Sequence, residues 1–298
     1  MMLGSIALDT RMSVVLQTSA VPDAVGVYLF WSERDYPLYV GKSVALRSRV
    51  RTHFAAREER AMCRQVRRIE IRETAGELGA LLLESRLIKE LRPMYNHALK
   101  QQRRIIVARG TENEYGYISV RLEPVTSINP KEGESILGLF KTKLQASEFL
   151  SDISKSHRLC LKLLGLEQTR RHCFGYHLHQ CDGACMNEEN SDAYNRRLES
   201  AFDARRIKAW PFSGAMLIEE KSDDGNRGEV FVVDNWCLLY SFMYAENAKG
   251  LRVRGSHRFD YDSYKILAGY VFEKKNAERI REVRQDELKN LLSTLKAA

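Results

Sequence analysis

The alternation of apolar and polar positions over residues 26–42 predicts an antiparallel hairpin. Two short apolar runs, GVYLFW and PLYVGK, flank the polar segment SERDY, which has the composition of a hairpin loop. Alternate residues of a strand share a face. We therefore expect Tyr28 and Phe30 on one face of the hairpin, and Val27 and Leu29 on the other.

Helical periodicity replaces this alternation over residues 44–56. Leu46 and Val50 lie on one apolar stripe, and Arg49 and His53 lie four positions apart along its edge. We expect a helix with a buried stripe and a basic edge beside it.

A third strand over residues 66–74 and a helix over 75–91 follow. Glu84 falls in the centre of the apolar stripe of this helix. Burying a carboxylate costs several kcal/mol unless a positive partner meets it, so a metal ion or an arginine is expected there. The alternative is a rim position, where Glu84 pairs with Arg86 or Arg92.

The rest of the chain predicts further helices and strands. The helix over 191–208 would be capped by Ser191 or Asp192 and would be exposed or phosphate-facing, with its basic residues Arg196, Arg197, Arg205, Arg206 and Lys208. The other expected elements are strands over 104–107 and 117–122, a helix over 142–163, and strands over 215–219, 229–233 and 237–244. Turns are expected at Asp224-Gly225 and Asp234-Asn235.

The expected fold class is α+β, in four parts. An extension (1–20) precedes a domain with a small mixed sheet flanked by helices (21–98). A strand pair, helices and a Cys-rich linker follow (99–209), and the last part (210–298) is β-rich with a terminal helix. A length of 298 residues fits two modest domains.

Charge favours a polyanionic partner. The chain carries 47 Lys and Arg against 39 Asp and Glu, a net charge of +8. The excess is concentrated over residues 42–72, where the acids are Glu58, Glu59 and Glu70. Arginine dominates this stretch, and its planar fork suits phosphate, so nucleic acid is the favoured partner. A solvated basic face without a ligand is the alternative.

No secretory signal or membrane span is expected from the sequence. The first twenty residues include Asp9 and Arg11 and have no unbroken apolar region. No apolar run approaches the length of a membrane span. The six cysteines are therefore expected in a reducing cytosol, where a cluster suggests a metal site before it suggests disulfides.

Six residues together carry a family resemblance. They are Tyr28, Tyr39, Lys42, Arg49, Glu84 and Asn96. Within GVY, YVG and the segments PLYVGKSVALRSRVRTHF and LLLESRLIKELRPMYN, their order and spacing resemble the GIY-YIG nucleases, and most closely the UvrC branch. Taken alone, each tyrosine would be read as an ordinary strand aromatic.

The resemblance implies metal-dependent hydrolysis of DNA. Glu84 would hold one Mg²⁺ or Mn²⁺ ion, since a single carboxylate with several waters suits such hard cations. A tyrosine, Tyr28 or Tyr39, would orient or deprotonate the attacking water. Arg49 would grip the scissile phosphate and Lys42 would add charge near the water or tyrosine. Asn96 would hydrogen-bond within the site.

The DNA-binding set expected from the first helix comprises Lys42, Arg47, Arg49, Arg51 and His53. UvrC relatives commonly carry tyrosine at the position of His53, so the contact made there is expected to differ. His53 lies one turn from Arg49 and could reach a phosphate.

Four cysteines form a second candidate site. Cys160, Cys173, Cys181 and Cys185 have the spacing C-x12-C-x7-C-x3-C, which does not fit a zinc ribbon built from two close pairs. Irregularly spaced thiolates are compatible with an iron–sulfur cluster, and the resemblance to UvrC implies a 4Fe-4S cluster. The alternatives are zinc, held by some of these cysteines with His172, His177 or His179, and four free thiols.

The resemblance covers about residues 21–208 and then ends. The remaining ninety or so residues are too few for a second nuclease and a DNA-binding module. The chain therefore resembles the short UvrC homologues, whose implied role is the 3′ incision in nucleotide excision repair, on damaged duplex DNA marked by UvrB after loading by UvrA, in the bacterial cytoplasm. The alternatives are a GIY-YIG restriction or mobile-element endonuclease and a non-catalytic nucleic-acid-binding factor.

Overall fold

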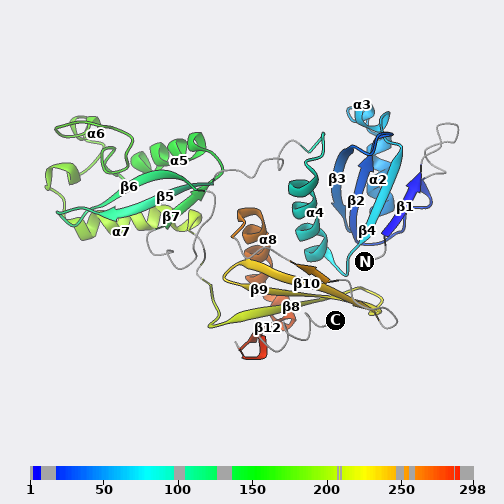
Figure 1. Cartoon of the computed structure of the whole chain (residues 1–298). Helices are drawn as coiled ribbons and strands as arrows, with labels where there is room; N and C mark the ends of the chain where they lie inside the picture. The colour runs from blue at the N-terminus through cyan, green and yellow to red at the C-terminus, as the bar shows by residue number, and fades with distance from the viewer. Residues whose placement is uncertain are drawn as a thin grey trace. The chain divides into compact units, whose positions relative to one another are not determined.

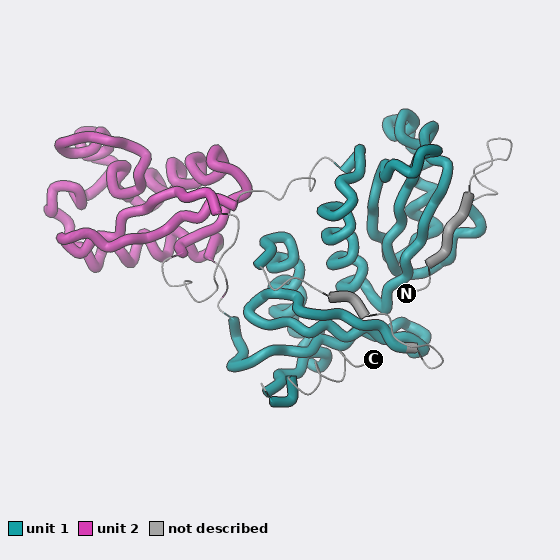
Figure 2. The backbone as a smooth tube through the Cα atoms, in the orientation of Figure 1, with its two compact units in different colours: residues 1–102, 210–298 teal, residues 103–209 magenta. Residues whose placement is uncertain are grey.

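The chain forms two compact units, and the first is built from both ends of the sequence. In this computed structural model they are Met1–Gln102 with Trp210–Ala298, and Arg103–Ala209 (Figure 2). The structure describes residues 3–7, 18–96, 105–125, 136–206, 208, 210–245, 252–254, 259–284 and 286–288.

A four-stranded sheet forms the N-terminal part of unit 1. Its order is β1-β4-β2-β3, with β1 (Leu3–Ala7), β2 (Gly26–Trp31), β3 (Pro37–Ser43) and β4 (Arg68–Glu73). The predicted hairpin is confirmed as β2 paired with β3. The expectation of a mixed sheet is wrong, because all described pairings here are antiparallel. Strands β3 and β4 run the same way, but β2 separates them.

Two helices cover the opposite faces of this sheet (Figure 1). Tyr28 and Phe30 pack in one core with residues of α2 (Leu46–Ala55), followed by the short α3 (Arg60–Cys63). Val27 and Leu29 pack in another with residues of α4 (Glu77–Leu91). The predicted alternation of faces in the hairpin is therefore confirmed.

The residues expected to form an extension, 1–20, include a sheet strand. Strand β1 pairs with β4 in antiparallel register from Leu3 opposite Arg72 to Ala7 opposite Arg68. It supplies a hydrogen-bonding neighbour to β4 on the side away from β2. Residues 8–17 lie outside the described part.

The C-terminal part of unit 1 is a five-stranded antiparallel sheet with helix α8 (Tyr261–Val271). Its order is β11-β10-β9-β8-β12, with β8 (Ala215–Lys221), β9 (Arg227–Asp234), β10 (Cys237–Ala245), β11 (Arg252–Arg254) and β12 (Ile280–Val283). The predicted strands are confirmed as β8, β9 and β10. The short edges β11 and β12 were not predicted, and the end of the chain, where a terminal helix was expected, lies largely outside the described residues.

Two buried glutamates of this sheet contact the first turn of α4. The carboxylate of Glu220 accepts hydrogen bonds from the backbone N–H groups of Leu78 and Gly79, each at 2.9 Å. These are among the N–H groups that a helix leaves unpaired at its start, where negative charge is stabilising. A Cβ atom at Gly79 would lie 2.3 Å from Glu229 Oε2, so any larger residue there would displace the Glu229 carboxyl group. The C-terminal sheet thus caps α4.

Ion pairs extend the same contact along α4. Lys89 pairs with Asp260 at 2.6 Å and with Asp262 at 3.0 Å, both at the start of α8. Arg227 of β9 pairs with Glu73 at the end of β4. Both ends of α4 are therefore tied to the C-terminal part.

Unit 2 has a three-stranded sheet, β6-β5-β7, with two main helices. The elements are β5 (Ile105–Glu112), β6 (Ile118–Val125), β7 (Ile136–Phe140), α5 (Lys143–Ser156), α6 (Phe174–His177) and α7 (Ser191–Phe202). The predicted strand pair is confirmed as β5 and β6, although residue 104 is outside the described part.

Both predicted helices of unit 2 were too long. Helix α5 ends at Ser156 rather than near residue 163, because Arg158 adopts a left-handed conformation (φ 51°) that turns the chain and buries Cys160. Helix α7 ends at the buried Phe202, where a 3₁₀ turn follows. Its cap is Asn190, whose side chain accepts from the N–H of Ala193, in place of Ser191 or Asp192.

None of the helices in the described residues is long and apolar enough to cross a membrane.

The buried carboxyl of Glu229 predicts a pH-dependent stability. Burial, followed by repulsion from Glu220, raises its pKa to about 7. The unfolded chain loses the proton of this carboxyl group at the ordinary glutamate pKa, whereas the folded protein keeps it until about pH 7. The free energy of unfolding therefore falls as pH rises between these two pKa values, and the whole loss is present above pH 7. Glu229→Gln is therefore expected to increase the free energy of unfolding by about 1–3 kcal/mol near pH 8 and by much less near pH 5.

Thermal or urea unfolding at both pH values measures this difference. Glu278→Gln, at an exposed position, is the matched control and should change neither value. An equal effect of Glu229→Gln at both pH values would contradict the assignment.

Candidate active site

The site is organised along the free edge of β3. Within the described part of the chain, strand β3 pairs with another strand, β2, on one side only, so its outward backbone groups need other partners. The N–H of Lys42 donates to Glu84 Oε1 at 3.0 Å. The side-chain amide of Asn96 accepts from the N–H of Val40 at 2.9 Å and donates to the carbonyl of Val40 at 2.8 Å. Glu84 and Asn96 are therefore fixed beside β3 by its own backbone.

Gly41 makes room for two tyrosine rings at this edge. A Cβ atom there would lie 2.4 Å from the Tyr28 hydroxyl and 2.8 Å from a ring carbon of Tyr39. The centroids of the two tyrosine rings are 6.1 Å apart. The glycine of the YVG segment is thus required by close packing, and it brings both tyrosines to one place.

Glu84 is a half-buried carboxylate surrounded by positive groups. Burial raises its pKa, while the N–H of Lys42 and the charges of Lys42 and Arg49 oppose the rise. Arg86 lies 3.9 Å from Glu90, and among the residues that the structure describes no ion pair joins Glu84 to Arg86 or Arg92, which counts against the rim alternative. A half-buried carboxylate of this kind fits a hard divalent cation that keeps most of its waters.

Lys42 has a partner that the sequence analysis did not single out. Its ammonium pairs with Glu77, the first residue of α4. The backbone and the side chain of Lys42 therefore contact two acidic residues of the same helix, seven positions apart in the chain. An acid in the first turn of a helix that follows the YVG segment is the signal that could have identified it.

Both tyrosines are protonated and neutral near neutral pH. Burial raises the pKa of Tyr28, and the neighbouring Tyr39 adds to this. Burial also raises the pKa of Tyr39, and the carboxylate of Glu84 raises it further. Arg49 lowers the pKa of both through its charge, but not enough to reverse the direction. Neither phenol can therefore take a proton from water unless a neighbouring group accepts the proton that the phenol already carries.

The expected basic edge of α2 holds for Arg49 and is wrong for His53. Arg49 is exposed, whereas His53 is only 2% exposed and points into the core. His53 Nε2 lies 2.6 Å from the Tyr28 hydroxyl, and its Nδ1 lies 2.5 Å from Glu59 Oε2. This burial is inconsistent with a direct phosphate contact by His53. Sequence reasoning also missed Glu59, one of the few acids in the basic stretch.

The other arginines of α2 have structural contacts as well as charge. Arg47 donates to the carbonyl of Val21 at 2.7 Å, and Arg51 donates to the Thr18 hydroxyl at 3.4 Å. Arg51 is exposed and Arg47 is half-buried. Each can present charge at the surface while it holds the segment before β2.

The four cysteines of unit 2 come together in its core. Cys160, Cys173 and Cys185 have sulfur atoms within 4.8 Å of one another. The sulfur of Cys173 lies 3.6 Å from those of Cys160 and Cys181. Burial raises the pKa of Cys160, and it raises that of Cys181 to about 11. Such thiols stay protonated unless a metal ion binds them.

The sulfur separations test which metal fits. Four thiolates at about 2.3 Å from one zinc ion lie about 3.8 Å apart, since that is the edge of the tetrahedron. The two separations of 3.6 Å match this spacing. Thiolates of a 4Fe-4S cluster bind separate irons and would have to lie further apart. The Nε2 atoms of His172 and His177 lie 2.6 Å apart. Among the described residues, the side chains close enough together to share a metal ion are cysteines, without a histidine.

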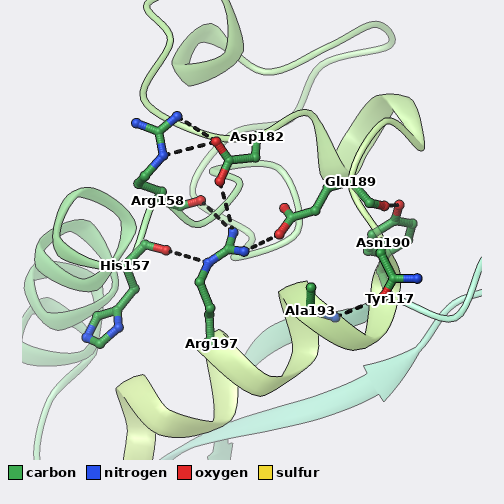
Figure 3. Close-up of polar contacts among 8 residues, drawn as sticks. All are labelled: Tyr117, His157, Arg158, Asp182, Glu189, Asn190, Ala193 and Arg197. Atoms are coloured by element: carbon green, nitrogen blue, oxygen red, sulfur yellow. Dashed lines mark hydrogen bonds and ion pairs between the residues drawn. The ribbon is translucent and has the colours of Figure 1, made fainter.

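Arg197 of α7 joins the two segments that carry these cysteines (Figure 3). Its guanidinium donates to the carbonyls of His157 and Arg158, before Cys160, at 3.0 and 3.2 Å. It also pairs with Glu189 and, at 3.5 Å, with Asp182. The expected exposed, phosphate-facing role is therefore wrong for Arg197.

Three family models match consecutive parts of the chain. The UvrC-like GIY-YIG domain matches residues 24–97. The UvrC/Cho excinuclease middle domain matches residues 115–204, which include the four cysteines. The excinuclease Cho C-terminal domain matches residues 215–287.

Curated relatives match along most of the chain. Excinuclease Cho of Salmonella typhi is 38% identical over 252 residues, 84% of this chain and 83% of that protein. Excinuclease Cho of Escherichia coli K12 is 37% identical over 250 residues, 83% of this chain and 82% of that protein. The UvrABC system protein C of Desulforudis audaxviator is 33% identical over 191 residues, 60% of this chain but 29% of that protein.

A solved structure is similar over the N-terminal part. It is the GIY-YIG N-terminal endonuclease domain of UvrC from Thermotoga maritima, bound to its catalytic divalent cation, magnesium. It is 28% identical and covers 28% of this chain and 99% of that domain, with a TM-score of 0.27. The family models and the curated relatives establish the relationship without it: this chain belongs to the excinuclease Cho family and is a GIY-YIG endonuclease.

Proposed function

We propose that this endonuclease makes the 3′ incision beside a lesion during nucleotide excision repair, on DNA already marked by UvrB that UvrA has loaded. The reaction would be hydrolysis of one phosphodiester bond, dependent on Mg²⁺ or Mn²⁺. The observation that carries the proposal is the placement of Glu84 against the backbone of Lys42 at the β3 edge, where Tyr28, Tyr39 and Arg49 also meet.

Each residue of the site would have a distinct task. Glu84 would hold the divalent ion, which supplies charge neutralisation and a more acidic water. The forked guanidinium of Arg49 is exposed, charged and suited to the scissile phosphate. The Lys42 ammonium would leave its ion pair with Glu77 and contact the substrate or the attacking water instead. Asn96 would keep β3 and the turn after α4 in register through its bonds to Val40.

DNA binding would rest on charge rather than on base reading. Lys42, Arg47, Arg49 and Arg51 offer phosphate contacts. Damage recognition is therefore assigned to the partner proteins, in the bacterial cytoplasm. A restriction or mobile-element endonuclease would need no such helpers, and matches to the Cho domains over the middle and C-terminal parts count against that alternative.

The second proposed centre is a metal held by Cys160, Cys173, Cys181 and Cys185. The resemblance to UvrC implies a 4Fe-4S cluster, and zinc is the alternative that the 3.6 Å separations favour. Either would hold two distant loops of unit 2 together and would offset the cost of burying four thiolates.

The first experiment is incision of a duplex that carries one bulky lesion, with and without UvrA and UvrB, in Mg²⁺ or EDTA. We expect a single 3′ nick that requires both helpers and the metal ion. Nicking of undamaged DNA without helpers would overturn the repair assignment in favour of the restriction-type alternative.

Glu84→Gln is expected to abolish most of this activity without unfolding the protein. Its amide oxygen can still accept from the N–H of Lys42, but the charge that would hold the metal ion is gone. We expect the single-turnover rate to fall roughly 100- to 1,000-fold, which is the size of effect typical of a lost electrostatic contact at the reacting phosphate. Glu90→Gln, an exposed position on the same helix, is the control. A Glu84→Gln protein with normal rates would exclude Glu84 as the metal ligand.

Metal analysis and visible absorption of aerobically and anaerobically purified protein separate the proposed cysteine centres. A cluster gives about four irons per chain and a broad visible band, whereas zinc gives one colourless ion. Cys173→Ser should lose either metal and lower the melting temperature, because Cys173 contacts two other thiols. Cys237→Ser, outside the group, is the control. Metal-free protein with unchanged stability would establish four free thiols.

A further inference from the structure

We propose that Glu59 holds His53 in the tautomer that accepts a proton from Tyr28, so that Tyr39, Tyr28, His53 and Glu59 form a proton relay out of the active site. This inference rests on the proposed hydrolysis of a phosphodiester bond, and it names the route by which the attacking water loses its proton. Glu59 is a positioning residue in this relay, since it acts only through His53.

Two short contacts define the order of the relay. Glu59 Oε2 lies 2.5 Å from His53 Nδ1, and the Tyr28 hydroxyl lies 2.6 Å from His53 Nε2. The Tyr39 ring lies beside the Tyr28 ring, with centroids 6.1 Å apart, so its hydroxyl is the proposed next link. The four side chains come from β2, β3, α2 and the segment between α2 and α3. Residues far apart in the chain thus place their polar groups beside one another.

The chemistry of the end member fixes the direction of the protons. A carboxylate has only acceptor atoms, so His53 donates its Nδ1 proton to Glu59. A neutral imidazole has one proton, and its Nε2 must then accept. Tyr28 therefore donates to His53, and its oxygen can accept from Tyr39. Every link points from the site toward Glu59.

Exposure indicates which tyrosine meets the water. Tyr28 has no exposed surface, whereas Tyr39 is half-buried. Tyr39 is therefore the link that contacts the reacting water, and Tyr28 is the link behind it. This assignment explains how a fully buried tyrosine takes part in the reaction.

The surroundings of His53 favour the neutral ring before reaction and the charged ring after it. Burial lowers the pKa of His53, and the charge of Arg49 lowers it further, while Glu59 raises it. The other titratable groups that face His53 are Tyr28, Tyr39 and Cys63, whose thiol donates to the His53 carbonyl. The ring is thus free to accept, and Glu59 stabilises the imidazolium that forms.

The proposed step balances in protons and bonds. The water oxygen forms a bond to phosphorus as the bond from phosphorus to the leaving oxygen breaks. One proton passes from water to Tyr39, while those of Tyr39 and Tyr28 move on to Tyr28 and His53. The leaving oxygen takes a proton from solvent, and His53 later returns its extra proton to solvent. No free phenolate has to form.

The experiment is the pH profile of single-turnover incision by wild type, Glu59→Gln, His53→Gln and the double variant, with all helpers and Mg²⁺ present. Because Glu59 raises the pKa of His53, Glu59→Gln should move the acidic limb of the profile to lower pH. The plateau rate should fall about 10- to 100-fold, within the range of general acid–base effects. In the His53→Gln background, Glu59→Gln should have no further effect.

Glu58→Gln, one residue away and exposed, is the matched control and should leave the profile unchanged. An unmoved acidic limb, or equal effects of Glu59→Gln with and without His53, would overturn the relay. Nitrogen NMR of wild-type His53 reads the tautomer without any incision assay: a proton on Nδ1 supports the proposal, and one on Nε2 rejects it. If the wild-type protein does not nick DNA although His53 carries its proton on Nδ1, the proposed repair function is wrong, while the assigned hydrogen bonds of His53 to Tyr28 and Glu59 are upheld.

Discussion

The outer edge of β3, which no described strand covers, is the constraint on which the active site depends. A strand at the edge of a sheet exposes backbone donors and acceptors that need partners. Here Glu84 and Asn96 serve as those partners, at Lys42 and Val40. The same hydrogen bonds that complete the sheet therefore set the positions of two side chains with proposed chemical roles. Gly41, between them in the strand, leaves the space that the tyrosine rings fill.

The position of Glu84 also depends on residues far along the chain. Helix α4 carries Glu84, and its first turn is capped by Glu220 of the C-terminal sheet. Glu229 packs against Gly79 in the same turn, at the cost of a raised pKa. A buried carboxylate pair of this kind is unfavourable in itself. The cost is offset at Glu220, because the N–H groups of Leu78 and Gly79 donate hydrogen bonds to its carboxylate. The nuclease helix is therefore held by residues outside its own sheet.

Local patterns in the sequence predicted the elements, and they failed where distant contacts decide. Alternation and helical periodicity identified β2, β3, α2 and α4. A half-buried strand or helix has apolar residues at a regular spacing along the sequence, so these elements can be recognised from local sequence alone. His53 was misplaced although it follows Leu46 and Val50 at helical spacing, because the partners that satisfy a buried imidazole, Tyr28 and Glu59, lie outside α2. The cap on α4 was invisible because Glu220 is 142 positions from Leu78. Family resemblance supplied the candidate roles that spacing alone left open.

The division of unit 1 between the two ends of the chain has a consequence for biosynthesis. Residues 103–209 lie between its two halves in sequence and form their own compact core. During translation this middle unit can be complete before Glu220 and Glu229 are synthesised. Until then the first turn of α4 lacks the hydrogen bonds that Glu220 accepts from it. Closing so long a loop is slow. Completion of unit 1 therefore requires the last ninety or so residues, and chains truncated before them would carry every residue of the proposed site on an unfinished scaffold.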